Sequence, residues 1–122
     1  MTWKILYVDD EDDIREVAVL SLELEPRFEV KACSSGTEAL ELVRAWKPDL
    51  ILLDVMMPGL DGPSTFRQLI VEHGPSVPPV LFCTARLQAS DVQSYLDLGA
   101  RGVVSKPFDP MALARTVGSH LE

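Results

Sequence analysis

Short apolar runs alternate with amphipathic stretches along the whole chain. The apolar runs are rich in strand-forming residues and predict β-strands at residues 3–8, 28–33, 49–54, 79–84 and 102–105. Between these runs, apolar residues recur at the three- and four-residue spacing of one helix face. The pattern therefore predicts five successive strand–helix units.

The predicted helices carry recognisable start and stop signals. The first helix stops before Pro26, Pro63 suits the first position of a third helix over 63–73, and Gly99 caps a fourth over 89–98. We expect Asp109 to be the N-cap of the last helix, with Pro110 in its first turn. The inner faces expected for the first, second and last helices are Ile14, Val17, Ala18, Ser21 and Leu22; Ala39, Leu40, Val43 and Trp46; and Met111, Leu113, Ala114 and Val117.

This alternation predicts an α/β fold, a doubly wound parallel sheet covered by helices on both faces. Residues 49–54 and 79–84 are almost wholly apolar, as expected of central strands. Residues 28–33 alternate apolar and polar, which favours an edge strand. These features fit the flavodoxin-like (βα)5 arrangement with strand order 2-1-3-4-5.

Length and composition fit a single domain over residues 1–122, with no output domain in this chain. The chain is 47% hydrophobic and 25% charged, which are ordinary globular values. No apolar run reaches the roughly 18–20 residues that span a bilayer, and the N-terminus lacks the features of a signal peptide. We therefore expect a cytoplasmic protein without membrane insertion.

Acidic residues dominate the charge, most visibly in the run DDEDD at residues 9–13. The net charge of −8 argues against direct nucleic-acid binding, because a phosphate backbone repels an acidic surface. Asp12 and Asp13 fit the first turn of a helix, whose positive end favours acids, and Glu11 is expected to be solvated. Asp9 and Asp10 have no such role, and like charges this close disfavour ionisation unless a cation is present.

Polar side chains stand at the ends of four of the five predicted strands: Asp9 and Asp10, Asp54, Thr84, and Lys106. Parallel strands end at one edge of the sheet, and such sheets bind ligands there, beside the switch point between the first and third strands. Three carboxylates offer the hard oxygen ligands that suit Mg²⁺. Each residue alone fits a helix cap or turn equally well. Four strands contributing together favour a site.

At these positions the sequence resembles the receiver domain of two-component response regulators. The matching segments keep the family's order and spacing across essentially the whole chain: VDDE (8–11), LLDVMMPGLDG (52–62), FCTA (82–85) and SKPF (105–108). The resemblance implies a phosphorylation-dependent signalling switch, like the single-domain chemotaxis receivers. It also implies that the domain is not a conventional enzyme, because it would catalyse only its own Mg²⁺-dependent aspartyl phosphorylation and dephosphorylation.

The resemblance implies a role for each group at the strand ends. Asp54 would be the phosphoacceptor, a carboxylate nucleophile that takes a phosphoryl group from a phosphohistidine. Asp10 and Asp54 would bind Mg²⁺, with Asp9 acting directly or through water. Lys106 would pair with phosphoryl oxygens and Thr84 would hydrogen-bond one of them. This set suits phosphoryl transfer, in which positioning and charge neutralisation do most of the work.

The same resemblance assigns further positions. The backbone carbonyl of Met56 would be another Mg²⁺ ligand, and the peptide bond before Pro107 would be cis. Residues 85–98 would move on phosphorylation, but Val103 stands where many receivers have a switching aromatic residue, which leaves the transmission of the movement open. Met56 and Arg86 would tune the lifetime of the phosphoryl group: Met56 has no side-chain group to orient water, and Arg86 either covers the phosphoryl group or is a solvated charge.

The expected partners are a sensor histidine kinase or a histidine phosphotransfer protein, and a downstream effector protein. The effector would contact the face formed by the fourth helix, the fifth strand and the fifth helix; phosphorylation-dependent dimerisation is left open.

Three other classes remain as alternatives. A hydrolase with an aspartyl-phosphate intermediate would carry a second acid at the position of Met56. A flavin or nucleotide module would have a glycine-rich or hydroxyl-rich loop after the first strand, where this chain has five acids. A phosphorylation-independent interaction domain would not need the acidic, hydroxyl and lysine positions.

Overall fold

The computed structural model describes residues 2–121, and its elements follow the predicted alternation. The strands are β1 (Trp3–Val8), β2 (Phe28–Cys33), β3 (Leu50–Asp54), β4 (Val80–Thr84) and β5 (Gly102–Ser105). The helices are α1 (Asp12–Leu22), α2 (Gly36–Trp46), α3 (Gly62–His73), α4 (Ala89–Leu98) and α5 (Leu113–Gly118), with a short 3-10 helix, η1 (Gly74–Ser76), after α3.

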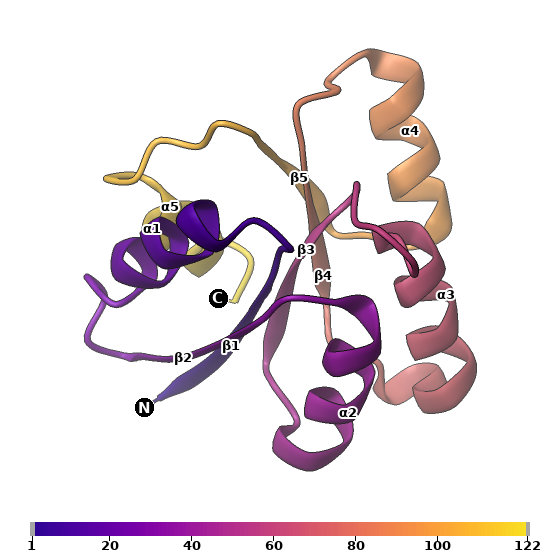
Figure 1. The fold of residues 1–122 in the computed structure, drawn as a ribbon, viewed down its shortest axis with the longest axis horizontal. Helices are drawn as coiled ribbons and strands as arrows, with labels where there is room; N and C mark the ends of the chain where they lie inside the picture. Colours follow the sequence, from indigo (N-terminus) through magenta and orange to yellow (C-terminus); the bar gives the residue numbers. More distant parts are fainter. Residues whose placement is uncertain (1, 122) are drawn as a thin grey trace.

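The strands form one parallel sheet in the order β2-β1-β3-β4-β5, which confirms the predicted flavodoxin-like topology. Helices α1 and α5 lie on one face of the sheet, and α2, α3 and α4 lie on the other (Figure 1). Each face has its own apolar cluster, because successive strand residues point to opposite sides. Leu6, Ile51 and Phe82 belong to one cluster, and Tyr7 and Leu52 belong to the other.

The burial of each strand explains its place in the sheet. Every residue of β3 and β4 is buried, as expected of central strands. Strand β2 alternates between covered and exposed residues and forms one edge, as predicted. The register pairs Asp54 with Cys83 and Thr84 with Ser105. The ends of β3, β4 and β5 therefore lie at one edge of the sheet.

Local capping chemistry sets several helix ends. The Ser35 hydroxyl accepts the Glu38 N–H at 3.1 Å at the start of α2. At the start of α3, Asp61 Oδ1 accepts the Ser64 N–H at 2.8 Å, and Pro63 lies in the first turn as predicted. Gly99 ends α4 with φ 119°, which confirms it as the left-handed cap.

The beginning of the last helix was predicted wrongly. Residues 109–112 form a turn that is closed by the Ala112 N–H, which donates to the Asp109 carbonyl at 3.0 Å. Asp109 Oδ1 also accepts the N–H of Met111 at 3.0 Å, and regular helix begins only at Leu113. Because Met111 lies in that turn, its side chain is 75% exposed instead of facing the sheet. Val17 of α1 was also expected on the inner face but is 43% exposed. It lies at the margin of the helix, where it lines a groove with Pro107.

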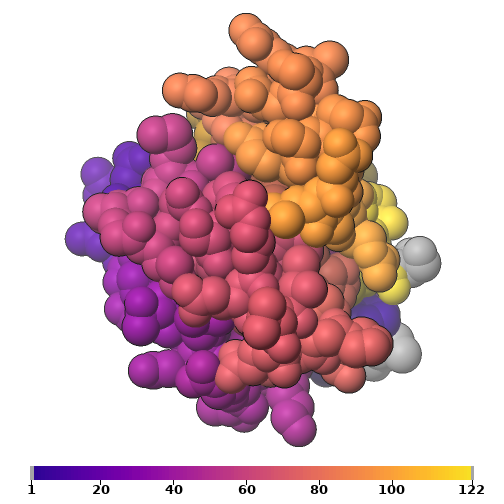
Figure 2. All heavy atoms as spheres, turned by 90° about the vertical axis from the view of Figure 1, so that its right-hand side faces the viewer, coloured from indigo at the N-terminus to yellow at the C-terminus, as the bar shows by residue number. Residues whose placement is uncertain are grey.

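Helix α4 is the most weakly packed of the long helices. None of its residues is buried, whereas α1, α2 and α3 each bury at least three. Figure 2 views the side covered by α2, α3 and α4, and the segment that leads into α4 protrudes at the top of that view. Within residues 2–121, no helix combines the length and apolar character needed to cross a membrane.

Candidate functional site

The predicted polar residues meet at the carboxyl edge of the sheet. Asp9 and Asp10 directly follow β1, Asp54 and Thr84 end β3 and β4, and Lys106 directly follows β5. Strands β1 and β3 are neighbours in the sheet although they are not consecutive in the chain, so the acids lie at the topological switch point. The structure thus brings together all five residues that the strand ends predicted.

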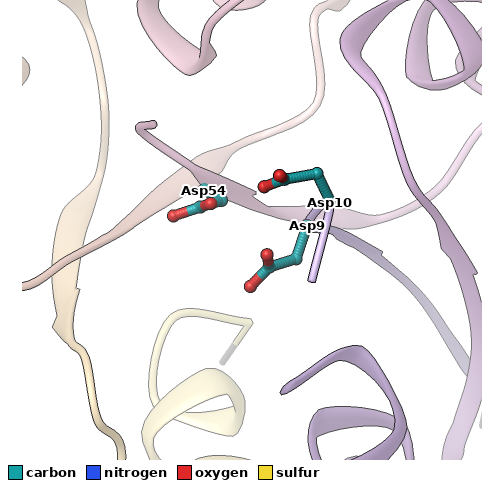
Figure 3. A group of neighbouring side chains, drawn as sticks. All are labelled: Asp9, Asp10 and Asp54. Atoms are coloured by element: carbon teal, nitrogen blue, oxygen red, sulfur yellow. The ribbon is translucent and has the colours of Figure 1, made fainter. Parts of the chain in front are cut away.

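Three carboxylates form the centre of the site. One oxygen each of Asp9, Asp10 and Asp54 lies within 4.8 Å of the others. Figure 3 shows the Asp9 and Asp10 side chains projecting from the end of β1 toward Asp54. Asp9 and Asp54 are only 0% and 4% exposed, while Asp10 is half-buried. An all-oxygen, anionic donor set with one member open to solvent fits Mg²⁺, which binds one or two carboxylates and keeps several waters.

The carboxylate of Asp9 accepts three hydrogen bonds. Its Oδ2 accepts from the hydroxyl of Tyr7 at 3.0 Å and from Lys106 Nζ at 3.1 Å. Its Oδ1 accepts the backbone N–H of Glu11 at 3.0 Å. Arg15 Nη1 also donates to the Asp9 carbonyl at 2.8 Å, and this bond fixes the backbone where β1 turns into α1.

Lys106 bridges the acids of β1 and β3. Its Nζ lies 3.1 Å from Asp9 Oδ2 and 3.2 Å from Asp54 Oδ1. Burial alone would lower the pKa of Lys106, but the hydrogen bonds and charges of Asp9 and Asp54 outweigh it, so the pKa is raised and the ammonium form is favoured. The Lys106 N–H donates to the Thr84 carbonyl at 2.9 Å, and the Lys106–Pro107 peptide bond is cis, as the family resemblance implied.

Asp54 carries uncompensated negative charge. Burial raises the pKa of its carboxyl group to about 6, and the neighbouring charge of Asp9 adds to that rise. Lys106 opposes the rise without cancelling it. One ammonium group therefore does not balance the buried carboxylates, and the site favours a further cation.

Thr84 is buried, and its hydroxyl oxygen accepts the backbone N–H of Arg86 at 3.0 Å. This bond links the end of β4 to the loop that leads into α4. The hydroxyl hydrogen remains available for a second partner, because a hydroxyl both donates and accepts. The side chain of Arg86 is exposed.

The remaining predicted positions surround the site less tightly. Met56 lies in the loop after β3 with an exposed side chain. Val103 of β5 is half-buried and pairs with Phe82 of β4. The Phe82 ring packs against the rings of Phe66 and of Tyr95 in α4, at centroid distances of 5.7 and 5.1 Å.

Sequence reasoning missed several residues that support the site. Tyr7 was read only as a strand residue, although residues two apart on a strand share a face, so its spacing from Asp9 was a usable signal. Glu11 is exposed as predicted, but it also approaches Lys106 Nζ at 3.7 Å. Gly62 was noted only as part of the matching segment 52–62, yet a Cβ there would lie 2.3 Å from the carbonyl oxygen of Asp54. This crowding by distant backbone can be seen only in the structure.

Comparison with known proteins agrees with this geometry. A sequence model of the family described as response regulator receiver domain matches residues 5–118. Transcriptional regulatory protein CseB of Streptomyces coelicolor is 43% identical over 113 residues, covering 93% of this chain and 47% of that protein. DNA-binding response regulator MtrA of Mycobacterium tuberculosis is 36% identical over 121 residues, covering 99% of this chain and 51% of that protein. The chain thus spans about half the length of these curated relatives.

Solved structures show the same fold. The chemotaxis response regulator CheY4 of Vibrio cholerae superposes with a TM-score of 0.88 at 28% identity, covering 98% of both chains. The receiver domain of the Francisella response regulator 1452 gives a TM-score of 0.87 at 27% identity, covering 97% of this chain and 95% of that one. The chain therefore belongs to the response regulator receiver domain family of two-component signalling.

Proposed function

We propose that Asp54 is the phosphoacceptor of this domain. The observation that carries the proposal is the contact of Lys106 Nζ with Asp54 Oδ1 at 3.2 Å, inside a cluster of acids at the sheet's switch point. An Asp54 oxygen would form a bond to phosphorus as the N–P bond of a phosphohistidine breaks. The imidazole nitrogen would keep the electron pair of that bond and gain a proton.

The other residues of the site neutralise charge and position the reacting groups. Asp10 and Asp54 would hold Mg²⁺, with Asp9 and the carbonyl of Met56 completing the protein's contribution. When bound, Mg²⁺ neutralises charge on the transferring oxygens. Lys106 already lies beside Asp54 and would pair with a second phosphoryl oxygen. The same groups would support slow loss of the phosphoryl group to water, so the domain would catalyse only its own modification.

Thr84 would transmit the modification to α4. A phosphoryl group adds about −1.5 to −2 charge and three acceptor oxygens, and the Thr84 hydroxyl can donate to one of them. Movement of Thr84 would pull the loop that it contacts through the Arg86 N–H. The Phe82–Tyr95 contact offers a second link between β4 and α4, in place of an aromatic residue at Val103. The result would be a changed surface over α4, β5 and α5.

Two exposed side chains would set the lifetime of the phosphoryl group. Met56 offers no polar group to orient an attacking water, and Arg86 extends from the loop after Thr84. The absence of a directing group at Met56 favours a longer-lived phosphorylated state.

The proposed partners follow from the phosphoryl chemistry. A sensor histidine kinase or a histidine phosphotransfer protein would supply or accept the phosphoryl group, and an effector protein would read the changed surface, with a phosphorylation-dependent second copy as a further candidate. The relatives CseB and MtrA are named as a transcriptional regulator and a DNA-binding regulator, but they are about twice as long as this chain. With a net charge of −8, this chain is proposed to act through proteins and not by direct contact with DNA.

Intact-mass measurement after incubation with acetyl phosphate tests the proposal. The wild type should gain one phosphoryl adduct that requires Mg²⁺, and Asp54→Asn should gain none. Asp13→Asn is a matched control, because it removes an exposed acid in the first turn of α1 and should keep the adduct. A folded wild-type protein that gains no adduct even from donor kinases would contradict the proposal and favour a phosphorylation-independent interaction domain.

A further inference from the structure

The hydroxyl of Tyr7 is buried directly beneath the acidic cluster. Tyr7 lies in β1 with no exposed surface, and its ring packs edge-on against Phe108 at 6.5 Å. Its hydroxyl donates to Asp9 Oδ2 at 3.0 Å. A phenylalanine at this position would satisfy apolar packing equally well. What the tyrosine adds is a buried hydroxyl, and the partner of this hydroxyl is Asp9 of the site.

The three hydrogen bonds to the Asp9 carboxylate are distributed unequally between its two oxygens. Tyr7 and Lys106 both donate to Oδ2, whereas Oδ1 accepts only the Glu11 N–H. A carboxylate offers about four lone-pair positions. Protein donors therefore occupy three of these lone-pair positions, two on Oδ2 and one on Oδ1. The position that is left for a cation is on Oδ1.

We propose that Tyr7 is a positioning residue for the cation site, whose hydroxyl holds the Asp9 carboxylate in the orientation that a cation shared with Asp10 and Asp54 requires. The inference rests on the proposed function, since it takes Mg²⁺ as the ligand of the cluster. Without the hydroxyl, Lys106 on Oδ2 and the Glu11 N–H on Oδ1 are the remaining bonds to the carboxylate, so its terminal torsion is less restricted. Hydrogen-bond partners that orient a metal-binding side chain typically contribute about 10–100-fold to metal affinity.

The substitution Tyr7→Phe isolates the hydroxyl. It keeps the ring, its apolar burial and its contact with Phe108, and removes only the bond to Asp9. Isothermal titration of the purified domain with Mg²⁺ should give a dissociation constant about tenfold higher than that of the wild type. At saturating Mg²⁺ the rate of phosphorylation by acetyl phosphate should return close to the wild-type rate, because Tyr7 acts through the cation site and does not touch the phosphoryl group.

Two further variants separate positioning from general loss of stability. Ser21→Ala removes another buried hydroxyl, which donates to the Val17 carbonyl at 2.7 Å in α1, away from the acids. It should leave the Mg²⁺ dissociation constant unchanged, because the hydroxyl that it removes does not contact the acids. In an Asp9→Asn background, Tyr7→Phe should no longer change Mg²⁺ affinity, because the side chain that it orients has lost its charge.

The outcomes distinguish this inference from the function on which it rests. A wild-type protein that neither binds Mg²⁺ nor gains a phosphoryl group would overturn both. A wild type that does both, together with a Tyr7→Phe dissociation constant within twofold of it, would overturn the inference alone. It would equally be overturned by a matching loss of affinity in Ser21→Ala, or by a full Tyr7→Phe effect that persists in the Asp9→Asn background.

Discussion

The ammonium nitrogen of Lys106 lies 3.2 Å from Asp54 Oδ1, and this contact joins the end of β3 to the residue that follows β5. The same nitrogen also contacts Asp9, so one cation is shared between two buried carboxylates. Asp10 adds a third carboxylate at the same place. The domain without metal therefore retains electrostatic repulsion that a metal ion or a neutral substitution would relieve.

Replacing Asp54 by Asn should stabilise the metal-free domain at neutral pH. Burial, together with the charge of Asp9, raises the pKa of Asp54 from its ordinary value of 3.8 to about 6 in the fold. A raised pKa means that the fold binds this proton more tightly than the unfolded chain does. The contribution of Asp54 to stability is therefore fully present below about pH 4 and is lost as pH rises through about 6. We expect Asp54→Asn to gain roughly 1–3 kcal/mol in free energy of unfolding at pH 7.5, measured by urea denaturation in EDTA.

The pH dependence of the gain in unfolding free energy serves as the control for Asp54→Asn. At pH 4.5 the wild-type carboxyl is mostly protonated in the fold, so the difference between wild type and Asp54→Asn should become small. An equal difference at both pH values would show that the cost of the buried, ionised Asp54 carboxylate is not the cause.

Removing the ammonium group of Lys106 should have the opposite effect and destabilise the domain. Lys106→Met keeps the apolar stem but leaves Asp9 and Asp54 without their common partner. Breaking a buried ion pair by removing one member typically costs about 3–5 kcal/mol. Urea denaturation at neutral pH should therefore show a loss of that order, which lessens as acid protonates the carboxylates.

Lys31→Met is the matched control for Lys106→Met. Lys31 is exposed and its Nζ lies 5.0 Å from the centroid of the Trp46 ring, a cation–π contact worth about 0.5–1 kcal/mol at such sites. Comparable losses in the two variants would mean that the bridge contributes nothing beyond an ordinary surface charge.

Mg²⁺ should stabilise the domain through Asp10. A ligand that binds only the folded state at about a hundred times its dissociation constant adds about 2.7 kcal/mol. Thermal unfolding of the wild type should shift upward accordingly when Mg²⁺ is added. Asp10→Asn should lose most of that shift, and Asp12→Asn, which changes an exposed acid in the first turn of α1, should retain it. Equal shifts in both variants would place the ion elsewhere.

The strand ends were predictable because parallel β-strands impose a simple geometry. Apolar runs located each strand, and parallel pairing then required Asp9, Asp54 and Thr84 to lie at one edge. Because strand–helix alternation implies a parallel sheet, and parallel strands all end at the same edge, the convergence of polar groups could be inferred from the sequence. The roles within the cluster came from the resemblance to receiver domains, since carboxylates at one sheet edge do not reveal which of them reacts.

The errors arose where local bonds compete with periodicity. Met111 fits an apolar helix position, but residues 109–112 form a turn, in which the Asp109 side chain accepts the Met111 N–H, and regular helix begins only after it. The role of Tyr7 was missed for a different reason: a tyrosine in a strand is ordinary, and its two-residue spacing from Asp9 indicates a shared face but not the hydrogen bond that the structure shows. Gly62 was likewise hidden, because the crowding comes from backbone distant in the chain.

Gly62→Ala should therefore destabilise the fold at the base of the site. The added Cβ would lie 2.3 Å from the Asp54 carbonyl oxygen, and backbone cannot rotate away as a side chain can. Overpacking of this kind typically costs about 1–3 kcal/mol. In Gly118→Ala the nearest atom to the new Cβ is in the Phe28 ring at 4.0 Å, so this variant at the end of α5 should unfold at or above the wild-type denaturant concentration. Equal stability of the two variants would contradict the predicted clash.

The hydroxyl of Thr84 should be needed for transmission but not for phosphorylation. Thr84→Ala removes the group that accepts the Arg86 N–H and that would donate to a phosphoryl oxygen. Amide hydrogen exchange of residues 85–98 should change on phosphorylation of the wild type, because α4 has no buried residue to resist movement. In Thr84→Ala the adduct should still form by intact mass, while the exchange of this segment stays unchanged. Thr84→Ser should restore the response, because it returns the hydroxyl. A full exchange response in phosphorylated Thr84→Ala would instead assign the coupling to Lys106 or to the Phe82–Tyr95 contact.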